Sequence, residues 1–393
     1  MSSVFHNAQI VLSDEVLHGS VRVADGEIVE ISDDPELAPN GSVIEDLGGD
    51  YLMPGLVELH TDQVEAHFQP RPKRFWDPVP AVIAHDAQMA ASGVTTVLDA
   101  LRIGTGPSDG NSVAESARTL VDAVIHAAEA DLLRADHYVH LRCEIATADV
   151  LDMFDELGAH ERVRLVSLMD HTPGQRQFAD VEHYRTYMTP KWGMSAEQFE
   201  AHVTQLAELS ARYSIPHRAM MAERARGRGI TMATHDDATT QHVDESSALG
   251  VRISEFPTTV EAARAAREAG QLILMGSPNI VRGGSHSGNV AAADLLAAGL
   301  LDILSSDYVP ASTLQAVFML FADDTITLPQ GSALVSANPA RASGLDDRGR
   351  IETGTRADLI RVHMREGVPT PKRPAGATVP IVRGVWREGR RVS

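Results

Sequence analysis

The fold is decided by the stretch Met53–Asp62, which reads MPGLVELHTD. Pro54-Gly55 breaks the chain just before an apolar run, as expected where a chain leaves one layer of a fold and enters another. Side chains two residues apart on a strand point the same way, so His60 and Asp62 at the end of the run aim at one point. The stretch therefore predicts a strand ending in a candidate metal site, although an H-x-D pair alone also fits a surface turn.

Length and composition indicate an ordinary globular protein. A chain of 393 residues suits two or three domains, although an α/β barrel alone can take about 250 residues. With 43% hydrophobic and 22% charged residues, the chain can bury a sizeable core. The sequence contains neither a run of about 18 apolar residues nor a signal-peptide pattern. The single cysteine, Cys143, excludes an internal disulfide, and we expect a cytoplasmic protein without membrane contact.

The formal net charge of −20 argues against a general nucleic-acid-binding protein. The same charge would repel an anionic substrate at long range, so local basic groups would have to overcome that repulsion. Six basic side chains lie close to the motifs described below: Arg71, Lys73, Arg74, Arg142, Arg176 and Arg282. Any one of them taken alone is better explained as a solvated surface charge.

The middle of the chain alternates apolar strands with helical segments, the pattern of a parallel βα protein. The expected strands are Gly55–Leu59, Thr95–Asp99, Val139–Cys143, Val163–Met169, Ile230–Thr234, Arg252–Glu255, Leu272–Met275 and Ile303–Ser305. The expected helices are Pro80–Ala91, Val113–Ala130, Ala196–Tyr213, Val260–Ala269 and Ala291–Leu296. Eight strands over roughly 300 residues favour a closed (β/α)₈ TIM barrel over an open sheet.

Both ends of the chain are rich in short strands. Residues 4–52 alternate strands with turns, and Asp25-Gly26 is a favourable hairpin turn. Asp358–Val362 and Ile381–Arg390 have the same character near the C-terminus. We therefore expect a small β-sandwich domain built from residues 1–53 and 350–393, with the barrel occupying residues 54–349.

Ionisable side chains follow several of the expected strands, at the end where TIM barrels carry their chemistry. The candidate ligands are His60, Asp62, Glu144, His171, His235 and Asp307. A lone histidine is more often a structural residue, but six such residues at corresponding strand ends rarely coincide by chance. Their nitrogen and oxygen donors suit one or two divalent cations and leave zinc, manganese, iron and cobalt open. A bound cation activates water at neutral pH, which points to hydrolysis.

Longer motifs carry a resemblance to a known family. They are Leu59–Gln63, Gln69–Pro72, Ser167–Phe178, Thr234–Thr239, Gly276–Asn289 and Leu304–Tyr308. Together with the expected β domain and barrel, they resemble the amidohydrolase superfamily, and within it the α-D-ribose 1-methylphosphonate 5-triphosphate diphosphatases of the carbon–phosphorus lyase pathway. In that superfamily the first strand normally carries H-x-H, the fourth a carboxylated Lys or a Glu, the fifth and sixth one His each, and the eighth an Asp. The resemblance assigns these positions to His60, Glu144, His171, His235 and Asp307, with Asp62 in place of the second His.

The resemblance implies a metal-dependent hydrolase of phosphonate catabolism that releases pyrophosphate from a ribosyl phosphonate triphosphate and leaves the 5-phosphate. Zinc is the first choice of metal. The resemblance further implies that His60, Asp62 and Asp307 hold one ion. His171 and His235 would hold the other, and Glu144 would bridge the two. Asp307 is the expected residue that orients or deprotonates the attacking water, and Glu144 is the second expected catalytic residue.

Substrate contacts are expected first from the segment Gly276–Asn289. Its glycines and serines let the backbone approach an oxyanion, although a simple tight turn explains the composition as well. Arg176 and Arg71 are two further candidates for phosphate contacts. The expected contacts within the segment are Asn279, Arg282, His286 and Ser287.

Two other functions fit the sequence less closely. A C–N hydrolase (an amidase, cyclic-imide hydrolase or deaminase) uses the same metal core in this superfamily, but its weakly charged substrates need no arginines. A catalytically inactive scaffold barrel would be expected to lose ligands, whereas this chain keeps one at each expected strand end. The expected partner is a small phosphorylated substrate, with no nucleic acid and no membrane, and the sequence leaves association into a homo-oligomer open.

Overall fold

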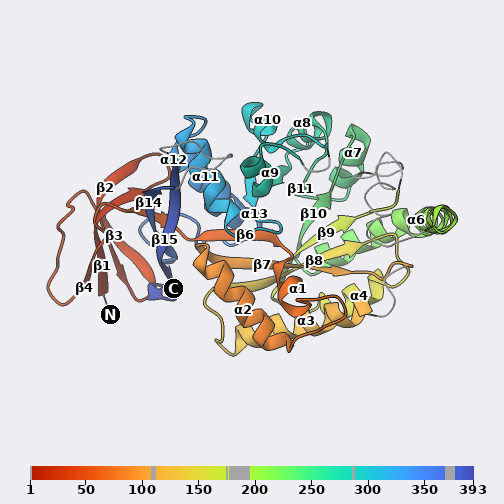
Figure 1. Cartoon of the computed structure of the whole chain (residues 1–393), viewed down its shortest axis with the longest axis horizontal. Coiled ribbons are helices and arrows are strands. Elements are labelled where there is room, and N and C mark those ends of the chain that lie inside the picture. The colour runs from red at the N-terminus through yellow and green to blue at the C-terminus, as the bar shows by residue number, and fades with distance from the viewer. Residues whose placement is uncertain (1, 108–111, 174–175, 177–194, 286–287, 368–376) are drawn as a thin grey trace.

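The computed structural model describes residues 2–107, 112–173, 176, 195–285, 288–367 and 377–393, which form a barrel beside a second sheet (Figure 1). All eight barrel strands are parallel, and they follow one another around the barrel in chain order. They are β6 (Leu56–Thr61), β7 (Val94–Ile103), β8 (Asp136–Glu144), β9 (Val163–Met169), β10 (Thr231–His235), β11 (Ile253–Glu255), β12 (Leu272–Gly276) and β13 (Ile303–Ser305). The predicted (β/α)₈ architecture is confirmed, with every predicted strand in place.

The first and last strands meet at a hydrogen-bonded seam. A parallel bridge joins Thr61 to Asp307, and the backbone N–H of Asp307 donates to the His60 carbonyl at 3.1 Å. Beneath this bridge, the buried carboxylate of Glu58 accepts hydrogen bonds from the Ser305 hydroxyl at 2.5 Å and from the Ser306 backbone at 2.7 Å. Burial raises the pKa of Glu58 despite these bonds. The seam fixes the ends of both strands, and therefore the residues just beyond them.

Helices cover the outside of the barrel, and several begin at a side-chain cap (Figure 1). Asp77, Thr239 and Thr259 each accept a hydrogen bond from a backbone N–H in the first turn of the helix that follows. The longer helices are α2 (Pro78–Ala91), α3 (Ser112–Glu129), α4 (Val150–Leu157), α6 (Ala196–Gly227), α7 (Thr240–Ala248), α8 (Val260–Glu268) and α11 (Ser312–Ala322). The shorter ones are α1 (Gln63–Phe68), α9 (Ser277–Arg282), α10 (Ala292–Ala297), α12 (Leu328–Ser332), the π-helical turn η2 (Ala333–Ala337) and α13 (Asn338–Ala342).

Helix α6 differs from its prediction. The predicted helix ends at Tyr213, whereas the structure continues it through Pro216 to Gly227. The extension is stabilised by packing, because Met221, Ala222 and Ala225 on its inner face are fully buried in the core between the barrel and its helices. Tertiary contact of this kind outweighs the local helix-breaking tendency of proline.

The second sheet is built from both ends of the chain, as predicted (Figure 1). Its strands are β1 (Ser2–Val11), β2 (Val16–Ala24), β3 (Glu27–Ser32), β4 (Val43–Asp46), β5 (Tyr51–Pro54), β14 (Leu359–Glu366), β15 (Thr378–Arg387) and β16 (Arg390–Arg391). The link between the two ends is the antiparallel pair of β14 and β5. Phe5 and Trp386 pack edge to face in the core of this sheet, with ring centroids 4.7 Å apart. The division at residues 53/54 and 349/350 stays a prediction.

Between β2 and β3 the chain turns at Asp25-Gly26, where both residues have positive φ angles of 51° and 87°. These angles match the predicted hairpin turn, and they favour the glycine at its second position. Among the described residues, no helix is long and apolar enough to cross a membrane.

Candidate metal centre

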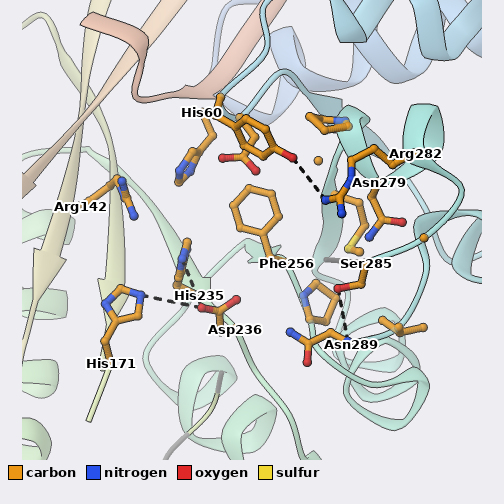
Figure 2. A pocket seen from close by; sticks show the side chains of 18 residues that line it. His60, Arg142, His171, His235, Asp236, Phe256, Asn279, Arg282, Ser285 and Asn289 are labelled. Atoms are coloured by element: carbon orange, nitrogen blue, oxygen red, sulfur yellow. Dashed lines mark hydrogen bonds and ion pairs between the residues drawn. The ribbon is translucent and has the colours of Figure 1, made fainter. Parts of the chain in front are cut away.

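A cavity of about 520 Å³ opens at the carboxyl ends of the barrel strands (Figure 2). This is the face where the sequence places its candidate ligands. The residues lining the cavity include His60, Arg142, His171, His235, Asp236, Phe256, Asn279, Arg282, Asp307 and Tyr308. The structure therefore brings four of the six predicted ligands, His60, His171, His235 and Asp307, to one cavity.

Two of these histidines share one buried carboxylate. Glu255, at the end of β11, has its Oε1 3.0 Å from His60 Nδ1 and its Oε2 3.1 Å from His235 Nδ1. The two rings stack with centroids 5.7 Å apart. Burial alone would raise the pKa of Glu255, but the neighbouring histidines outweigh burial and hold that pKa well below its ordinary value. Glu255 is therefore a carboxylate, which can only accept the Nδ1 protons.

A second group surrounds His171. Its Nδ1 lies 2.6 Å from Glu144 Oε2, and its backbone N–H donates to Glu144 Oε1 at 3.0 Å. Both oxygens of Glu144 thus contact His171 and fix its ring. Glu144 is not among the residues that line the cavity, and its observed contacts orient the candidate ligand His171. The bridging role predicted for Glu144 therefore stays a prediction.

Asp236 completes a set of three donors with His171 and His235. Its Oδ2 lies 3.4 Å from His235 Nε2 and 3.8 Å from His171 Nε2 (Figure 2). This oxygen is buried and makes no hydrogen bond within the described part of the chain. The three ligand atoms lie within 4.8 Å of one another. Two imidazole nitrogens and an unpartnered carboxylate oxygen at these distances fit a divalent metal ion such as zinc.

Asp307 enters the cavity from just beyond β13. Its backbone has a positive φ of 53°, a strained conformation for a residue with a side chain, and the seam with β6 holds it there. Burial raises its pKa, and the negative charge of Asp62 adds to the effect, while His60 opposes it. Asp62 is half-buried at the start of α1 and is not among the residues that line the cavity, so its ligand role stays a prediction.

The resemblance assigned Glu144, His171 and His235 each to a barrel strand one position later than the structure shows. Counted from β6, Glu144 ends the third strand, His171 follows the fourth and His235 ends the fifth. The sixth strand, where the superfamily pattern places a histidine, ends in Glu255. Sequence reasoning passed over Glu255, although its position at the end of a predicted strand was the signal that could have identified it.

Two residues of the Gly276–Asn289 segment that were predicted to contact substrate, Asn279 and Arg282, line the cavity. The first part of the segment is the helix α9 rather than an extended loop, and Asn279 and Arg282 project from it into the cavity (Figure 2). Arg282 Nη1 donates to the Tyr308 hydroxyl at 3.5 Å. The other two predicted contacts in the segment, His286 and Ser287, lie outside the described residues.

Arg176 and Arg71 do not line the cavity. Arg176 is buried, forms an ion pair with Asp237, and also contacts the His235 carbonyl at 3.4 Å. Burial lowers the pKa of Arg176 to about 9. These contacts of Arg176 hold the segment that carries His235 in place. Arg71 is exposed and its backbone bridges to Arg74, so a phosphate contact stays a prediction for both arginines.

Arg142, which the sequence marks only as a nearby basic residue, lines the cavity between His60 and His171 (Figure 2). It lies near the end of β8, two residues before Glu144. Its Nε is buried without a hydrogen-bond partner, and the side chain has neither an ion pair nor a hydrogen bond to any residue that the structure describes. An unpartnered guanidinium beside a cavity is suited to binding an oxyanion.

Comparison with known proteins agrees with this combination of barrel and site. The amidohydrolase family model matches residues 87–393, and the chain belongs to the amidohydrolase family, whose members are metal-dependent hydrolases. Within it, the chain is 46% identical over 391 residues to the α-D-ribose 1-methylphosphonate 5-triphosphate diphosphatase of Escherichia coli (strain K12). That similarity covers 99% of this chain and 100% of the relative.

Solved structures agree with the fold. Dihydropyrimidinase from Brevibacillus agri superposes with a TM-score of 0.65 at 13% identity, covering 100% of this chain and 95% of the other. N-acetylglucosamine-6-phosphate deacetylase from Pasteurella multocida superposes with a TM-score of 0.63 at 13% identity, covering 100% and 99%. At this level of identity the likeness establishes the barrel and second sheet and no particular substrate.

Proposed function

We propose that this protein hydrolyses α-D-ribose 1-methylphosphonate 5-triphosphate to the 5-phosphate and pyrophosphate, as a step of phosphonate catabolism. The observation that carries the proposal is the 46% identity with the Escherichia coli diphosphatase across 99% of this chain and all of the relative. The match therefore includes every strand that ends at the cavity.

The charges around the cavity support an anionic substrate. Arg142 lies beside the histidines and Arg282 lies on the wall formed by α9, so the cavity presents two guanidinium groups near the candidate metal ligands (Figure 2). Planar guanidinium groups match the oxygens of a phosphate chain. Two of them can offset the repulsion expected from a net charge of −20. A neutral amide or cyclic imide would leave both arginines without a role.

The residues that line the cavity would serve three purposes: metal binding, proton transfer and phosphate binding. His60, His171, His235, Asp236 and Asp307 would hold the metal ions, with zinc as first choice and manganese, iron or cobalt as alternatives. A bound metal supplies an activated water and neutralises negative charge on the phosphates. Asp307 would accept a proton from the attacking water, and Arg142 and Arg282 would bind phosphate oxygens and stabilise the leaving pyrophosphate.

The two alternative functions receive less support. The dihydropyrimidinase and hydantoinases among the solved structures share the fold at 13–15% identity, which is far below the 46% shared with the diphosphatase. An inactive scaffold would not need to retain the donors found at the cavity. The cytoplasmic location, the identity of the metal and self-association of the chain all stay predictions.

The experiment is phosphorus NMR of the purified, zinc-loaded protein with the ribosyl phosphonate triphosphate. The expected result is the joint appearance of pyrophosphate and the ribosyl 5-phosphate, with no turnover of dihydrouracil as a cyclic-imide control. A His235→Ala variant should lose this activity, which would exclude a contaminating phosphatase. Stepwise release of single phosphates, or turnover of the cyclic imide alone, would contradict the proposal.

A further inference from the structure

We infer that Glu255 is a positioning residue which sets the proton positions of His60 and His235 together. One carboxylate holds both rings in the form that can bind a metal through Nε2. The inference rests on the metal centre of the proposed function, but it concerns hydrogen bonds within the protein and can be tested without substrate.

The contacts give Glu255 an unusual position. Its side chain is fully buried, with one oxygen 3.0 Å from His60 Nδ1 and the other 3.1 Å from His235 Nδ1. The Ser167 hydroxyl donates a further hydrogen bond to Oε2 at 2.6 Å. Glu255 is not among the residues that line the cavity, whereas both histidines are. It therefore lies behind the two rings rather than beside them as a third ligand.

The next residue keeps both rings in this arrangement. The ring of Phe256 packs edge to face against His60 at 5.0 Å and against His235 at 5.3 Å (Figure 2). The aromatic contact on one side and the shared carboxylate on the other restrict rotation of both imidazoles. A change at Glu255 should therefore alter which nitrogen carries the proton before it alters where the rings lie.

The chemistry of a carboxylate explains why one residue can serve two histidines. A carboxylate has two acceptor oxygens and no donor, so each neutral histidine must carry its proton on Nδ1 and leave the Nε2 lone pair for a ligand. A glutamine at the same place offers one acceptor and one donor. Only one histidine could then donate to it; the other would face an N–H group, move its own proton to Nε2 and lose the lone pair needed for a metal.

The test compares Glu255→Gln with the wild-type protein, using histidines labelled with nitrogen-15 and zinc titration. Nitrogen NMR distinguishes the two neutral forms of histidine, and His60→Gln and His235→Gln variants assign the two signals. In metal-free wild type both residues should carry the proton on Nδ1. In Glu255→Gln one of them should carry it on Nε2, and zinc affinity should fall about 10- to 100-fold. The matched control is Glu268→Gln, the same substitution at an exposed position of α8.

Two outcomes would overturn the inference: unchanged proton positions in Glu255→Gln, or zinc affinity equal to that of the wild type. If Glu255→Gln does not fold, Glu255→Asp decides, because aspartate keeps two acceptor oxygens and should preserve both Nδ1 protons. Loss of both Nδ1 protons in the aspartate variant would also overturn the inference. Correct proton positions in a protein that releases no pyrophosphate would instead count against the proposed function alone.

Discussion

Two carboxylates in this molecule each lie between two imidazole rings, and they do different things. At the cavity, Glu255 contacts His60 and His235 at 3.0 and 3.1 Å. Both histidines line the cavity, where a ligand can reach them (Figure 2). We call these three residues the open cluster.

The second arrangement lies between helix α2 and the barrel strands β7 and β8. There Asp99 contacts His85 at 2.7 Å and His137 at 2.8 Å, and all three side chains are fully buried. We call these three residues the closed cluster. The far nitrogen of His137 lies 3.3 Å from the carboxylate of Asp86. This histidine therefore lies between two carboxylates and is enclosed by the protein.

Nε2 of His235 also faces a second carboxylate, Asp236 Oδ2, at 3.4 Å, but both groups line the cavity. The difference between the clusters is therefore whether the second ring nitrogen can be reached from a cavity. Burial would lower the pKa of His137, but the charges of Asp99 and Asp86 outweigh burial and raise that pKa to about 10. His137 is thus a cation that ties α2 to the barrel. The cavity histidines line an open site that a ligand can reach. The closed cluster should govern stability and the open cluster should govern metal binding.

The largest expected effect comes from breaking the closed cluster. His137→Ala removes one buried partner from Asp99, which keeps His85, and one from Asp86, which keeps Arg134. It should lower the free energy of unfolding by about 3–5 kcal/mol. Urea unfolding measures this loss. Zinc affinity of the folded variant should remain at the wild-type level. His160→Ala, which removes a partly exposed histidine 3.2 Å from Glu129, should cost less than about 1 kcal/mol. A loss of zinc binding in folded His137→Ala would contradict the claim that the closed cluster affects stability and not metal binding.

The pH dependence of stability sharpens the same distinction. The raised pKa of His137 means that its contribution is complete below its ordinary value of 6.5 and is lost as the pH rises through about 10. The pKa of Asp99 is lowered, because its two histidines outweigh burial, so its contribution is complete above its ordinary value of 3.8 and is lost as the pH falls below that value. The stability difference between wild type and His137→Gln should therefore shrink between pH 7 and pH 10. Urea unfolding at pH 6, 8 and 10 tests this, and a constant difference would contradict a cationic His137.

Sequence predicted the fold well because barrel strands buried on both faces appear as short apolar runs, and their polar ends mark the catalytic face. It predicted the position of His60 and Asp307 for the same reason. It could not assign Glu255 or Arg176, because the partners that define their roles are distant in the chain. Glu255 contacts His60, 195 residues away, and Arg176 pairs with Asp237. The sequence alone cannot distinguish a carboxylate that is buried against distant partners from one that lies on the surface.

A further difference between the clusters is the arginine beside each one. Arg134 beside the closed cluster pairs with Asp86 at 3.1 Å, whereas Arg142 at the open cluster has no partner among the described residues. Arg142→Ala should therefore lower kcat/KM for the triphosphate about ten- to hundredfold, the loss expected from one charge-assisted contact. Arg134→Ala should leave kcat/KM unchanged. Steady-state kinetics below saturation measure both, and equal effects of the two substitutions would remove Arg142 from the substrate site.

The smallest expected effect is at Arg282. This side chain is exposed and already contacts the Tyr308 hydroxyl, so water screens much of its charge. Arg282→Ala should reduce kcat/KM by about two- to tenfold, without changing zinc affinity or unfolding in urea. Arg282→Lys should restore part of the loss, because it keeps the charge but lacks the planar fork that fits phosphate oxygens. Wild-type kinetics in the alanine variant would show that Arg142 alone supplies the cationic contact, while a loss of stability would indicate that Arg282 holds α9 against Tyr308.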